Sequence, residues 1–457
     1  MKDTICAIST PAGMGAIAIV RASGEQAFDI AATLFGSSFD FAALQPNHTK
    51  FGVVHDGEQV IDQVVVVKYA APHSYTGEDM VEISCHGSVY IQKKILELLI
   101  EHGCRMATQG EFTQRAFLNG KLDLPQAEAI ADLIDSQTET THKLAINQLK
   151  GEFSNRIQEL REQFVQLASL LELELDFSEE EVEFANRDEL YQLLNTLDEE
   201  VERLTRSFKM GNVLRKGIPV AIVGQPNVGK STLLNAILQH DRAIVSHIPG
   251  TTRDTIEDTF TIDGTLFRFI DTAGIRQSED EIENFGIERT FQAIEQASVI
   301  LYMVDVTHAD ADTLCRELDE FKAQIDLSDK QLLLIANKID EMEVMPAHYT
   351  QWREMGVIFI SAKRRVNLEE IEEQLKHFVE AHRIQDLTLL TNERHYALLT
   401  SISSTIQRIR QGIDDQIPTD LLAEDVRAAL YDLGCLTGTI STDDILNTIF
   451  GKFCIGK

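Results

Sequence analysis

The first 120 residues alternate short apolar runs with one longer amphipathic segment. Thr4–Ser9, Ala16–Arg21 and Val60–Tyr69 are rich in isoleucine and valine, whose branched side chains favour strands. Tyr90–Glu101 instead places its apolar residues at the three- and four-residue spacing of a helix. This mixture of strands and helices predicts a compact α+β domain.

From Leu122 to about Phe208 the pattern becomes helical, with few glycine or proline residues to interrupt it. Helical periodicity returns after about Leu387 and continues to about residue 450. The acidic run Glu172–Glu183 is typical of a solvated helix face, and binding of a cation or a basic partner is the alternative. The pattern predicts an all-α domain built from two separate segments of the chain.

Between these helical segments, apolar strands alternate with amphipathic helices from residue 218 to about 380. The expected strands are Val220–Val223, Leu266–Ile270, Val299–Val304, Leu332–Ala336 and Val357–Ile360. Strands separated by helix-length segments indicate βαβ units and a mostly parallel sheet. Because the ends of a compact domain are often close together, such a domain can be inserted into a helical one. The predicted domains are residues 1–120 (α+β), 121–215 with 381–457 (helical), and 216–380 (inserted α/β).

The composition is that of a folded soluble protein, with 44% hydrophobic and 25% charged residues. No apolar run is long enough to cross a membrane, and Met1–Gly15 lacks the apolar core of a secretory signal. The six cysteines lie far apart without Cys-x-x-Cys spacing, which favours reduced thiols and a cytoplasmic location. A partial metal site at Cys85, His86 and Cys104 is the alternative, although no fourth ligand is evident.

The formal net charge of −32 is the most unusual bulk property. An acidic surface repels the phosphate backbone of a nucleic acid at long range. If the protein acts on RNA, a more basic partner is therefore expected to make most of the RNA contacts. An acidic surface with no bearing on partners is the alternative.

A phosphate-binding motif opens the α/β region. Gly224–Ser231 (GQPNVGKS) matches GxxxxGK[ST], follows the predicted strand Val220–Val223 and precedes a helical segment, Thr232–Leu238. Glycines allow the backbone N–H groups to surround a phosphate at a helix N-terminus, which favours anions. Lys230 would face the β- and γ-phosphates, and the Ser231 hydroxyl would bind Mg²⁺.

Two later motifs predict that the base is guanine. Asn337–Asp340 (NKID) follows a predicted strand, and Asp340 would accept two hydrogen bonds from N1–H and the 2-amino group of guanine. Adenine lacks this pair of donors, and a buried carboxylate without partners costs several kcal/mol. Ser361–Lys363 (SAK) ends the next strand, where a backbone N–H would bind guanine O6.

Two further motifs predict the switch regions of a Ras-like P-loop GTPase. Asp271–Gly274 (DTAG) would bind the Mg²⁺ shell through its aspartate and the γ-phosphate through its glycine N–H. Pro249–Asp254 (PGTTRD) is the expected first switch, with Thr252 as the second hydroxyl on Mg²⁺. Ras-like enzymes orient water with a glutamine directly after DxxG, but this chain has Ile275 there. Another residue must therefore orient the water and another charge must stabilise the γ-phosphate.

Long blocks of this sequence resemble the bacterial MnmE (TrmE) family of tRNA-modification GTPases. The similarity covers essentially the whole chain, and the blocks are TICAISTPAGMGAIAIVRASG, TGEDMVEISCHG, GEFTQRAFLNGKLDLPQAEA, GQPNVGKST, PGTTRD, DTAGIRQSEDEIENFGIER and FCIGK. The resemblance implies that K⁺ replaces an arginine finger and that dimerising G domains complete its site. The implied K⁺ ligands are Asn227, Ser246, Ile248 and Thr251; the family more often has threonine at the second of these. The implied water-orienting residue is Glu283, which Arg276 would help to position.

Motifs and resemblance together define the expected nucleotide site. Its catalytic residues are Glu283, Arg276 and Lys230, and its Mg²⁺ ligands are Ser231 and Thr252. The residues expected to contact GTP are Asn227, Val228, Gly229, Lys230, Ser231, Thr232, Ser246, His247, Ile248, Pro249, Gly250, Thr251, Thr252, Asp271, Thr272, Ala273, Gly274, Asn337, Lys338, Asp340, Ser361, Ala362 and Lys363.

The resemblance also implies that the amino-terminal domain forms a homodimer and binds 5-formyl-tetrahydrofolate or 5,10-methylene-tetrahydrofolate. The positions that carry over are Arg21, Glu82, Lys121 and Lys457. A carboxylate such as Glu82 suits the adjacent N–H donors of a pterin, and the cations suit the anionic parts of the folate. The end Cys454-Ile-Gly-Lys457 imitates a prenylation signal, but Gly456 and the final lysine argue against lipidation. Cys454 has two alternative roles, a direct one in the chemistry or simple packing.

The resemblance implies that the protein modifies C5 of the wobble uridine of certain tRNAs. Members of the family act with the flavoprotein MnmG (GidA), in a heterotetramer or larger complex. Together they install an aminomethyl or carboxymethylaminomethyl group from a folate one-carbon unit. One alternative is a regulatory or ribosome-assembly GTPase without modification chemistry, but no basic RNA-binding domain is visible. The other is a folate-binding dimer with a vestigial G domain, against which the intact motifs argue.

Overall fold

The computed structural model describes residues 3–35, 39–177, 187–240, 258–270, 291–308, 311–327, 330–342, 349–381, 392–451 and 453–456. The chain divides into two compact units, one of residues 1–135, 145–199 and 397–457, the other of residues 136–144 and 200–396. The first unit holds a mixed sheet and a helical part, and the second holds a mostly parallel sheet with helices, which confirms the predicted fold class. The three predicted domain ranges stay a prediction. No helix in the described part of the chain has the length and apolar character needed to cross a bilayer.

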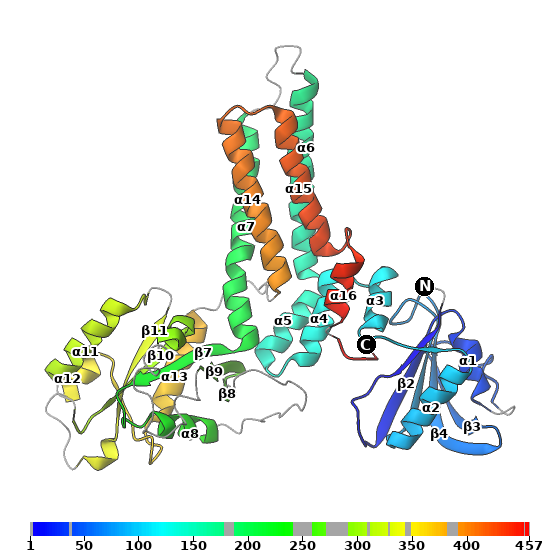
Figure 1. Ribbon diagram of the computed structural model, residues 1–457, viewed down its shortest axis with the longest axis horizontal. Helices are drawn as coiled ribbons and strands as arrows, with labels where there is room; N and C mark the ends of the chain where they lie inside the picture. The colour runs from blue at the N-terminus through cyan, green and yellow to red at the C-terminus, as the bar shows by residue number, and fades with distance from the viewer. Residues whose placement is uncertain are drawn as a thin grey trace. The chain divides into compact units, whose positions relative to one another are not determined.

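The amino-terminal part is built on a six-stranded sheet. Its strands are β1 (Ile5–Ile8), β2 (Ile17–Ser23), β3 (Thr49–Asp56), β4 (Gln59–Tyr69), β5 (Met80–His86) and β6 (Arg105–Met106). The spatial order is β3-β4-β5-β2-β1-β6, and all neighbours are antiparallel except β1 and β6. Helices α1 (Ala27–Thr33) and α2 (Val89–Glu101) cover one face of this sheet over an apolar core (Figure 1).

The opposite face of this sheet is only partly covered. Helix α3 (Glu111–Leu118) buries Phe112 against β1 there, and Tyr75 from the loop before β5 packs beside it. On the same face, Phe51 of β3 and Val65 of β4 are cross-strand partners and are 61% and 41% exposed. Exposed apolar partners of this kind leave part of the sheet open for another surface to cover.

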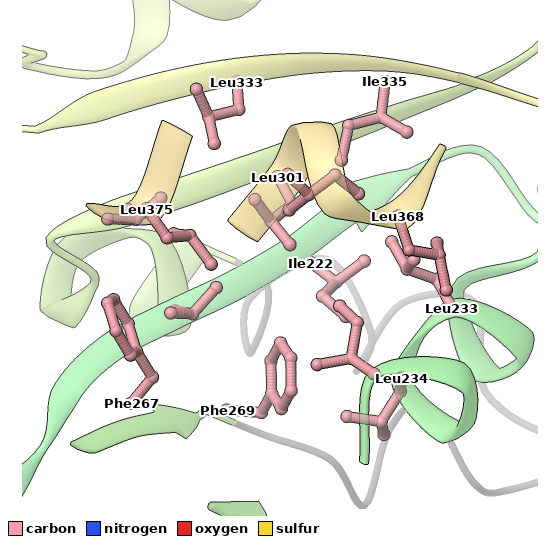
Figure 2. Close-up of a cluster of buried hydrophobic side chains, with 14 of the residues drawn as sticks. Ile222, Leu233, Leu234, Phe267, Phe269, Leu301, Leu333, Ile335, Leu368 and Leu375 are labelled. Carbon is pink, nitrogen blue, oxygen red and sulfur yellow. The ribbon is translucent and has the colours of Figure 1, made fainter. Parts of the chain in front are cut away.

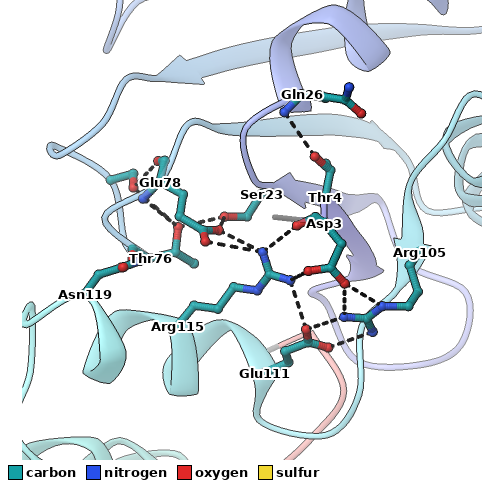
Figure 3. A network of polar contacts seen from close by, with 11 residues as sticks. Asp3, Thr4, Ser23, Gln26, Thr76, Glu78, Arg105, Glu111, Arg115 and Asn119 are labelled. Carbon is teal, nitrogen blue, oxygen red and sulfur yellow. Dashed lines mark hydrogen bonds and ion pairs between the residues drawn. The ribbon is translucent and has the colours of Figure 1, made fainter. Parts of the chain in front are cut away.

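A partly buried network of charges connects α3 to the strands (Figure 3). The Arg115 side chain is 1% exposed, and its Nη2 donates to Oδ1 of Asp3 at 2.9 Å and to Oε1 of Glu111 at 3.0 Å. Its Nη1 donates to the main-chain oxygen of Asp3 at 2.8 Å and to Glu78 at 3.1 Å. Arg105 adds a second cation to Glu111, with Nη2 2.6 Å from Oε1. The network therefore ties α3 to the loop before β5, which carries Glu78.

Glu111 should make the stability of this part of the chain depend on acid pH. Burial alone would raise the pKa of Glu111, but hydrogen bonds from Arg105, the Thr108 amide and Arg115 outweigh it and lower the pKa to about 2. A depressed pKa means that the stabilisation is complete above about pH 4.5 and is lost as the pH falls towards about 2. The loss is at most about 3 kcal/mol, since one pKa unit corresponds to 1.36 kcal/mol.

Urea unfolding at about pH 5 and about pH 3 tests this expectation. Glu111→Gln should be less stable than wild type at the higher pH and should lose less on acidification. Glu58→Gln, a change at an exposed glutamate in the β3–β4 turn, should behave like wild type. Equal acid sensitivity of Glu111→Gln and wild type would contradict the proposed role of the carboxylate.

Helices of 8 to 30 residues make up the predicted helical part. They are α4 (Leu124–Asp135), α5 (Glu139–Leu149), α6 (Glu152–Phe177), α7 (Arg187–Lys216), α14 (Glu393–Asp414), α15 (Thr419–Thr437) and α16 (Asp443–Phe450). In the first unit α6 and α15 lie side by side through apolar faces that include Leu167 and Val426 (Figure 1). The Arg410 side chain of α14 lies 3.4 Å from Asp198 of α7. The acidic run Glu172–Glu183 begins at the end of α6, and its residues 178–183 fall outside the described residues.

The second sheet forms the centre of the α/β part. Its strands are β7 (Ile218–Gly224), β8 (Asp258–Ile262), β9 (Thr265–Phe269), β10 (Val299–Asp305), β11 (Gln331–Asn337) and β12 (Ile358–Phe359). The order is β12-β11-β10-β7-β9-β8, and only β8 and β9 are antiparallel. The central strands β7 and β10 are buried along almost their whole length, as expected for parallel strands covered on both faces.

Helices cover both faces of this second sheet. On one face α8 (Lys230–His240) and α13 (Leu368–Ala381) bury leucines against Phe267 and Phe269 of β9 (Figure 2). On the other, α11 (Ala311–Gln324) and α12 (Tyr349–Glu354) contribute Leu314, Leu318 and the fully buried Trp352. This layered packing fixes the strands and leaves the loops at their carboxyl ends to form a site.

Candidate functional site

The candidate nucleotide site lies at the carboxyl edge of the second sheet. Strand β7 ends at Gly224, β10 at Asp305 and β11 at Asn337, and the three strands are parallel neighbours. The carboxyl ends of parallel strands meet at one edge, where open α/β sheets bind their ligands. The predicted phosphate and guanine motifs therefore emerge next to one another.

The phosphate loop needs its glycines because neighbouring atoms are very close. Gly224 has a φ of +146°, and an added Cβ there would lie 2.2 Å from the main-chain oxygen of Met303. Gly229 has a φ of +98°, and its Cβ would lie 2.4 Å from Nδ2 of Asn337. Asn227, between them, also has a positive φ of 65° and is exposed. A side chain at either glycine would displace the loop from the strand edge.

Lys230 begins helix α8 directly after this loop. Its Nζ donates to the main-chain oxygens of Gly224 at 2.8 Å and of Gln225 at 2.9 Å, and burial lowers its pKa. The ammonium thus lies within the loop, where a phosphate oxygen can take over as its acceptor. Ser231 and Thr232 follow in the first turn and are exposed. A lysine and hydroxyls at a helix N-terminus suit a phosphate and its Mg²⁺.

Asn337 holds the phosphate loop and the SAK loop together. Its Nδ2 donates to the main-chain oxygen of Val228 at 2.8 Å, and its Oδ1 accepts from the Ala362 amide at 2.9 Å. All three groups are buried, and each hydrogen bond joins segments more than 20 residues apart. The Asn337 side chain therefore connects the NKID motif to both the phosphate loop and the SAK loop.

Asp340 lies three residues after Asn337 and is held in position by the loop that carries Ser361 and Arg364. The hydroxyl of Ser361 donates to its Oδ1 at 2.6 Å, and Nε of Arg364 lies 3.6 Å from Oδ2. The Ser361 hydroxyl itself accepts from the Arg364 amide at 3.0 Å, so its proton points to Asp340. The carboxylate is only 7% exposed yet keeps acceptor positions free on both oxygens. Lys363 is exposed beside it.

Asp305 belongs to this site and was not predicted from the sequence. Lys338, which has a positive φ of 72°, places its Nζ 2.6 Å from Oδ2 of Asp305. Burial alone would raise the pKa of Asp305, but hydrogen bonds from Lys338 and Thr307 outweigh it and hold the pKa below its usual value. The signal for Asp305 was available, because it directly follows the predicted strand Val299–Val304.

Many of the predicted residues lie outside the described residues, and their roles stay predictions. They are Ser246, His247, Ile248, Pro249, Gly250, Thr251, Thr252, Asp271, Thr272, Ala273, Gly274, Arg276, Glu283 and Lys457.

The predicted folate residues that are described gather on the partly covered face of the first sheet. Arg21 and Glu82 are cross-strand partners, and two nitrogens of Arg21 donate to one oxygen of Glu82. Nη1 of Arg21 lies 3.4 Å from the main-chain oxygen of Gly456, next to the predicted Lys457. Lys121 donates to the main-chain oxygen of Pro72 at 3.1 Å, in the same loop that places Tyr75 against Arg21.

The carboxyl-terminal tail reaches this face through a residue that must be glycine. Gly456 has a φ of +97°, and an added Cβ would lie 2.4 Å from the main-chain oxygen of Ile8. The Ser9 hydroxyl donates to the Gly456 oxygen at 3.2 Å, and Ile455 pairs with Gln109. Cys454 is exposed.

The alternative metal site is not assembled. Among the described residues, no group of three or more histidine, cysteine, aspartate or glutamate side chains is placed to hold a metal. Burial, with the charge of Asp62, raises the pKa of Cys85 to about 11, which disfavours the thiolate that binds metals. Cys104 hydrogen-bonds to Cys6, and Nδ1 of His86 lies 2.7 Å from Asp62.

Comparisons with known proteins cover the whole chain. Residues 4–121 match the family model "GTP-binding protein TrmE N-terminus", and residues 124–454 match "MnmE helical domain". Many relatives carry the description tRNA modification GTPase MnmE, and three of them illustrate the similarity. The relative from Cytophaga hutchinsonii is 47% identical over 457 residues and covers 100% of this chain and 98% of its own. Those from Christiangramia forsetii and Flavobacterium johnsoniae are 49% and 48% identical, each covering 100% of this chain and 100% and 99% of their own.

Among solved structures, the G domain of the T. maritima FeoB iron transporter is 24% identical. The match covers 35% of this chain and 98% of the FeoB chain, with a TM-score of 0.25.

Proposed function

This chain belongs to the MnmE family of tRNA-modification GTPases, and from that premise we propose that it is a K⁺-dependent GTPase that takes part in tRNA modification. With the flavoprotein MnmG (GidA), it installs an aminomethyl or carboxymethylaminomethyl group at C5 of the wobble uridine of certain tRNAs, using a folate one-carbon unit. The observation that carries the nucleotide part is the pair of buried hydrogen bonds made by Asn337, one donated to Val228 and one accepted from Ala362, which hold the phosphate loop beside the SAK loop.

In the proposed binding mode each described motif has one task. Lys230 exchanges its two main-chain acceptors for oxygens of the β- and γ-phosphates, and Ser231 offers its hydroxyl to Mg²⁺, with Thr252 as the second ligand. Asp340 accepts the two N–H donors of guanine, and the loop Ser361–Lys363 supplies an N–H to O6. Mg²⁺ fits this donor set, because it takes oxygen ligands and is commonly held by a few protein oxygens together with the phosphates of the substrate.

Hydrolysis is proposed to need K⁺ beside the phosphates. Asn227 is exposed on the phosphate loop and offers a side-chain oxygen; Ser246, Ile248 and Thr251 are the other proposed ligands. A cation there stabilises charge that develops on the leaving GDP, as an arginine finger does. Glu283, helped by Arg276, is proposed to orient the attacking water.

Exchanging K⁺ for Na⁺ should slow hydrolysis at least tenfold, since an arginine finger contributes about 10³ to 10⁵ in rate. The measurement is the initial rate of GTP hydrolysis in each salt at several protein concentrations. Activity per molecule should rise with concentration in K⁺, because paired G domains complete the ion site.

A matched pair of variants tests the ligand. Asn227→Ala should lose the K⁺ stimulation, whereas Gln225→Ala, a change at another exposed residue of the same loop, should keep it. Equal rates in the two salts would remove K⁺ from the mechanism.

The folate part of the proposal rests on Arg21, Glu82, Lys121 and Lys457. The carboxylate of Glu82 suits the amino-substituted edge of a pterin, and the cations suit the carboxylates of a folate. The bound form is proposed to be 5-formyl-tetrahydrofolate or 5,10-methylene-tetrahydrofolate. Cys454, exposed on the tail that reaches the same face, remains a candidate for a chemical role.

The proposed assembly is a homodimer that joins MnmG in a heterotetramer or larger complex. Phe51 and Val65 are exposed apolar neighbours on adjacent strands. They support the proposal that a second protein surface covers this face of the amino-terminal sheet. The net charge of −32 supports a division of labour in which the flavoprotein makes most of the tRNA contacts. The cytoplasm is the proposed location.

Mass spectrometry of tRNA nucleosides tests the function as a whole. A strain that lacks this gene should lose the C5 modification of the wobble uridine, and the wild-type gene should restore it. Unchanged tRNA together with defective ribosomes would instead favour a regulatory or ribosome-assembly GTPase.

A further inference from the structure

The ion pair between Arg21 and Glu82 uses the two oxygens of the carboxylate unequally. Each side chain is 16% exposed, so the pair is shielded from water without being sealed. Nε and Nη2 of Arg21 both donate to Oε1 of Glu82, at 2.9 and 2.7 Å. A carboxylate offers about four lone-pair positions, two on each oxygen. Arg21 therefore occupies both positions on Oε1 and none on Oε2.

The surroundings of Arg21 keep it in this arrangement. Its guanidinium carbon lies 5.4 Å from the ring centre of Tyr75 and 5.5 Å from that of Phe112. Both distances are within the range of cation–π attraction. Its remaining nitrogen, Nη1, lies 3.4 Å from the main-chain oxygen of Gly456. Because rings and carbonyl hold the guanidinium, Oε1 stays occupied when a ligand arrives.

Tyr69, at the end of β4, is the partner of the other oxygen. Its hydroxyl donates to Oε2 of Glu82 at 3.3 Å, and the side chain is partly exposed. Oε2 keeps one acceptor position, and the hydroxyl oxygen of Tyr69 keeps lone pairs of its own. Two neighbouring acceptors, one from each residue, are thus available to a ligand.

We propose that Oε2 of Glu82 and the hydroxyl oxygen of Tyr69 together accept the two adjacent N–H donors of the folate's aminopyrimidine ring. Tyr69 is then a specificity-determining residue of the site. Glu82 cannot accept the two donors with its own two oxygens, because Arg21 occupies both acceptor positions of Oε1. This inference rests on the proposed folate site.

Calorimetric titration of the full-length protein with 5-formyl-tetrahydrofolate tests the inference. Tyr69→Phe keeps the ring and removes the acceptor, so the Kd should rise roughly 5- to 10-fold, as expected for one lost hydrogen bond. Tyr75→Phe is the matched control, because its hydroxyl bonds to Thr113 at 2.7 Å and its ring still stacks on Arg21. Its Kd should stay within about twofold of wild type. Unchanged far-UV circular dichroism and thermal unfolding of both variants show that the amino-terminal part remains folded.

A second ligand separates recognition from a purely structural effect. A folate analogue without the 2-amino group keeps a single ring N–H donor, which Oε2 of Glu82 can accept without Tyr69. Wild type and Tyr69→Phe should therefore bind this analogue with nearly equal affinity. The inference is overturned if Tyr69→Phe binds 5-formyl-tetrahydrofolate like wild type, or if it weakens both ligands by the same factor. Failure of the wild-type protein to bind any folate overturns the proposed folate site as well, which distinguishes the two failures.

Discussion

Replacing Asp340 by asparagine should turn a protein that prefers GTP into one that prefers XTP. The direction of the change follows from the Ser361 hydroxyl, which accepts from the Arg364 amide and therefore donates to Oδ1 of residue 340. An asparagine keeps its carbonyl oxygen on that donor, so its amide nitrogen takes the place of Oδ2. A donor then faces the 2-amino group of guanine, whereas xanthine offers a carbonyl oxygen at this position.

The expected effect is large because the hydrogen bond from the 2-amino group to Oδ2 is lost. The bond from N1–H is also weakened, since the acceptor is no longer charged. A hydrogen bond to a charged group contributes about 1.5–3 kcal/mol, so GTP affinity should fall roughly 100-fold. The measurement is the ratio of the dissociation constants for GTP and XTP. Asp305→Asn is the control, since Asp305 bonds to Lys338 and lies at the same sheet edge; it should weaken both nucleotides without changing their ratio. An unchanged ratio in Asp340→Asn would show that Asp340 does not contact the base.

Asn337→Ala should disable nucleotide binding and also destabilise the α/β part of the chain. The substitution removes both buried hydrogen bonds of the side chain, leaving the Val228 oxygen and the Ala362 amide without their partner. An unsatisfied buried group costs about 1–3 kcal/mol, so two of them cost roughly 2–6 kcal/mol. GTP affinity should fall by about 100-fold, because the phosphate loop and the SAK loop are no longer held together.

Thermal unfolding and GTP titration measure the two parts of this prediction. Gln225→Ala is a suitable comparison, since it removes an exposed hydrogen bond to Glu317 from the same loop and should have little effect on either quantity. Normal GTP affinity in a folded Asn337→Ala protein would contradict the role assigned to this side chain.

The positions of the described phosphate and guanine motifs at one sheet edge could be predicted closely because each motif is local. Each motif combines a short run of residues with the strand that precedes it, and the strands at Val299–Val304 and Leu332–Ala336 were predicted to within one residue at each end. Parallel strands then bring the motifs to one edge without further information. The prediction missed Asp305, which follows a strand without belonging to a motif, and Arg364, whose contact with Asp340 depends on the fold of the SAK loop.

The proposed folate residues could not be assembled from the sequence pattern in the same way. Strand β5, which carries Glu82, was not predicted, although Val81, Ile83 and Cys85 alternate with polar residues. The antiparallel register that places Glu82 opposite Arg21 joins residues 61 positions apart. Resemblance supplied these residues, while their geometry came from the structure.

By itself, the sequence determined the kind of nucleotide site and the class of each region, because hydrophobic periodicity and motif spacing act over a few residues. Tertiary structure decided which distant groups share a hydrogen bond: Asn337 between two loops, and Tyr69 with Arg21 on opposite sides of Glu82. Such pairings depend on strand order and register, which the packing of the whole sheet selects. For that reason a single carboxylate can be named from the sequence, but which of its oxygens keeps an acceptor position for a ligand can be seen only in the fold.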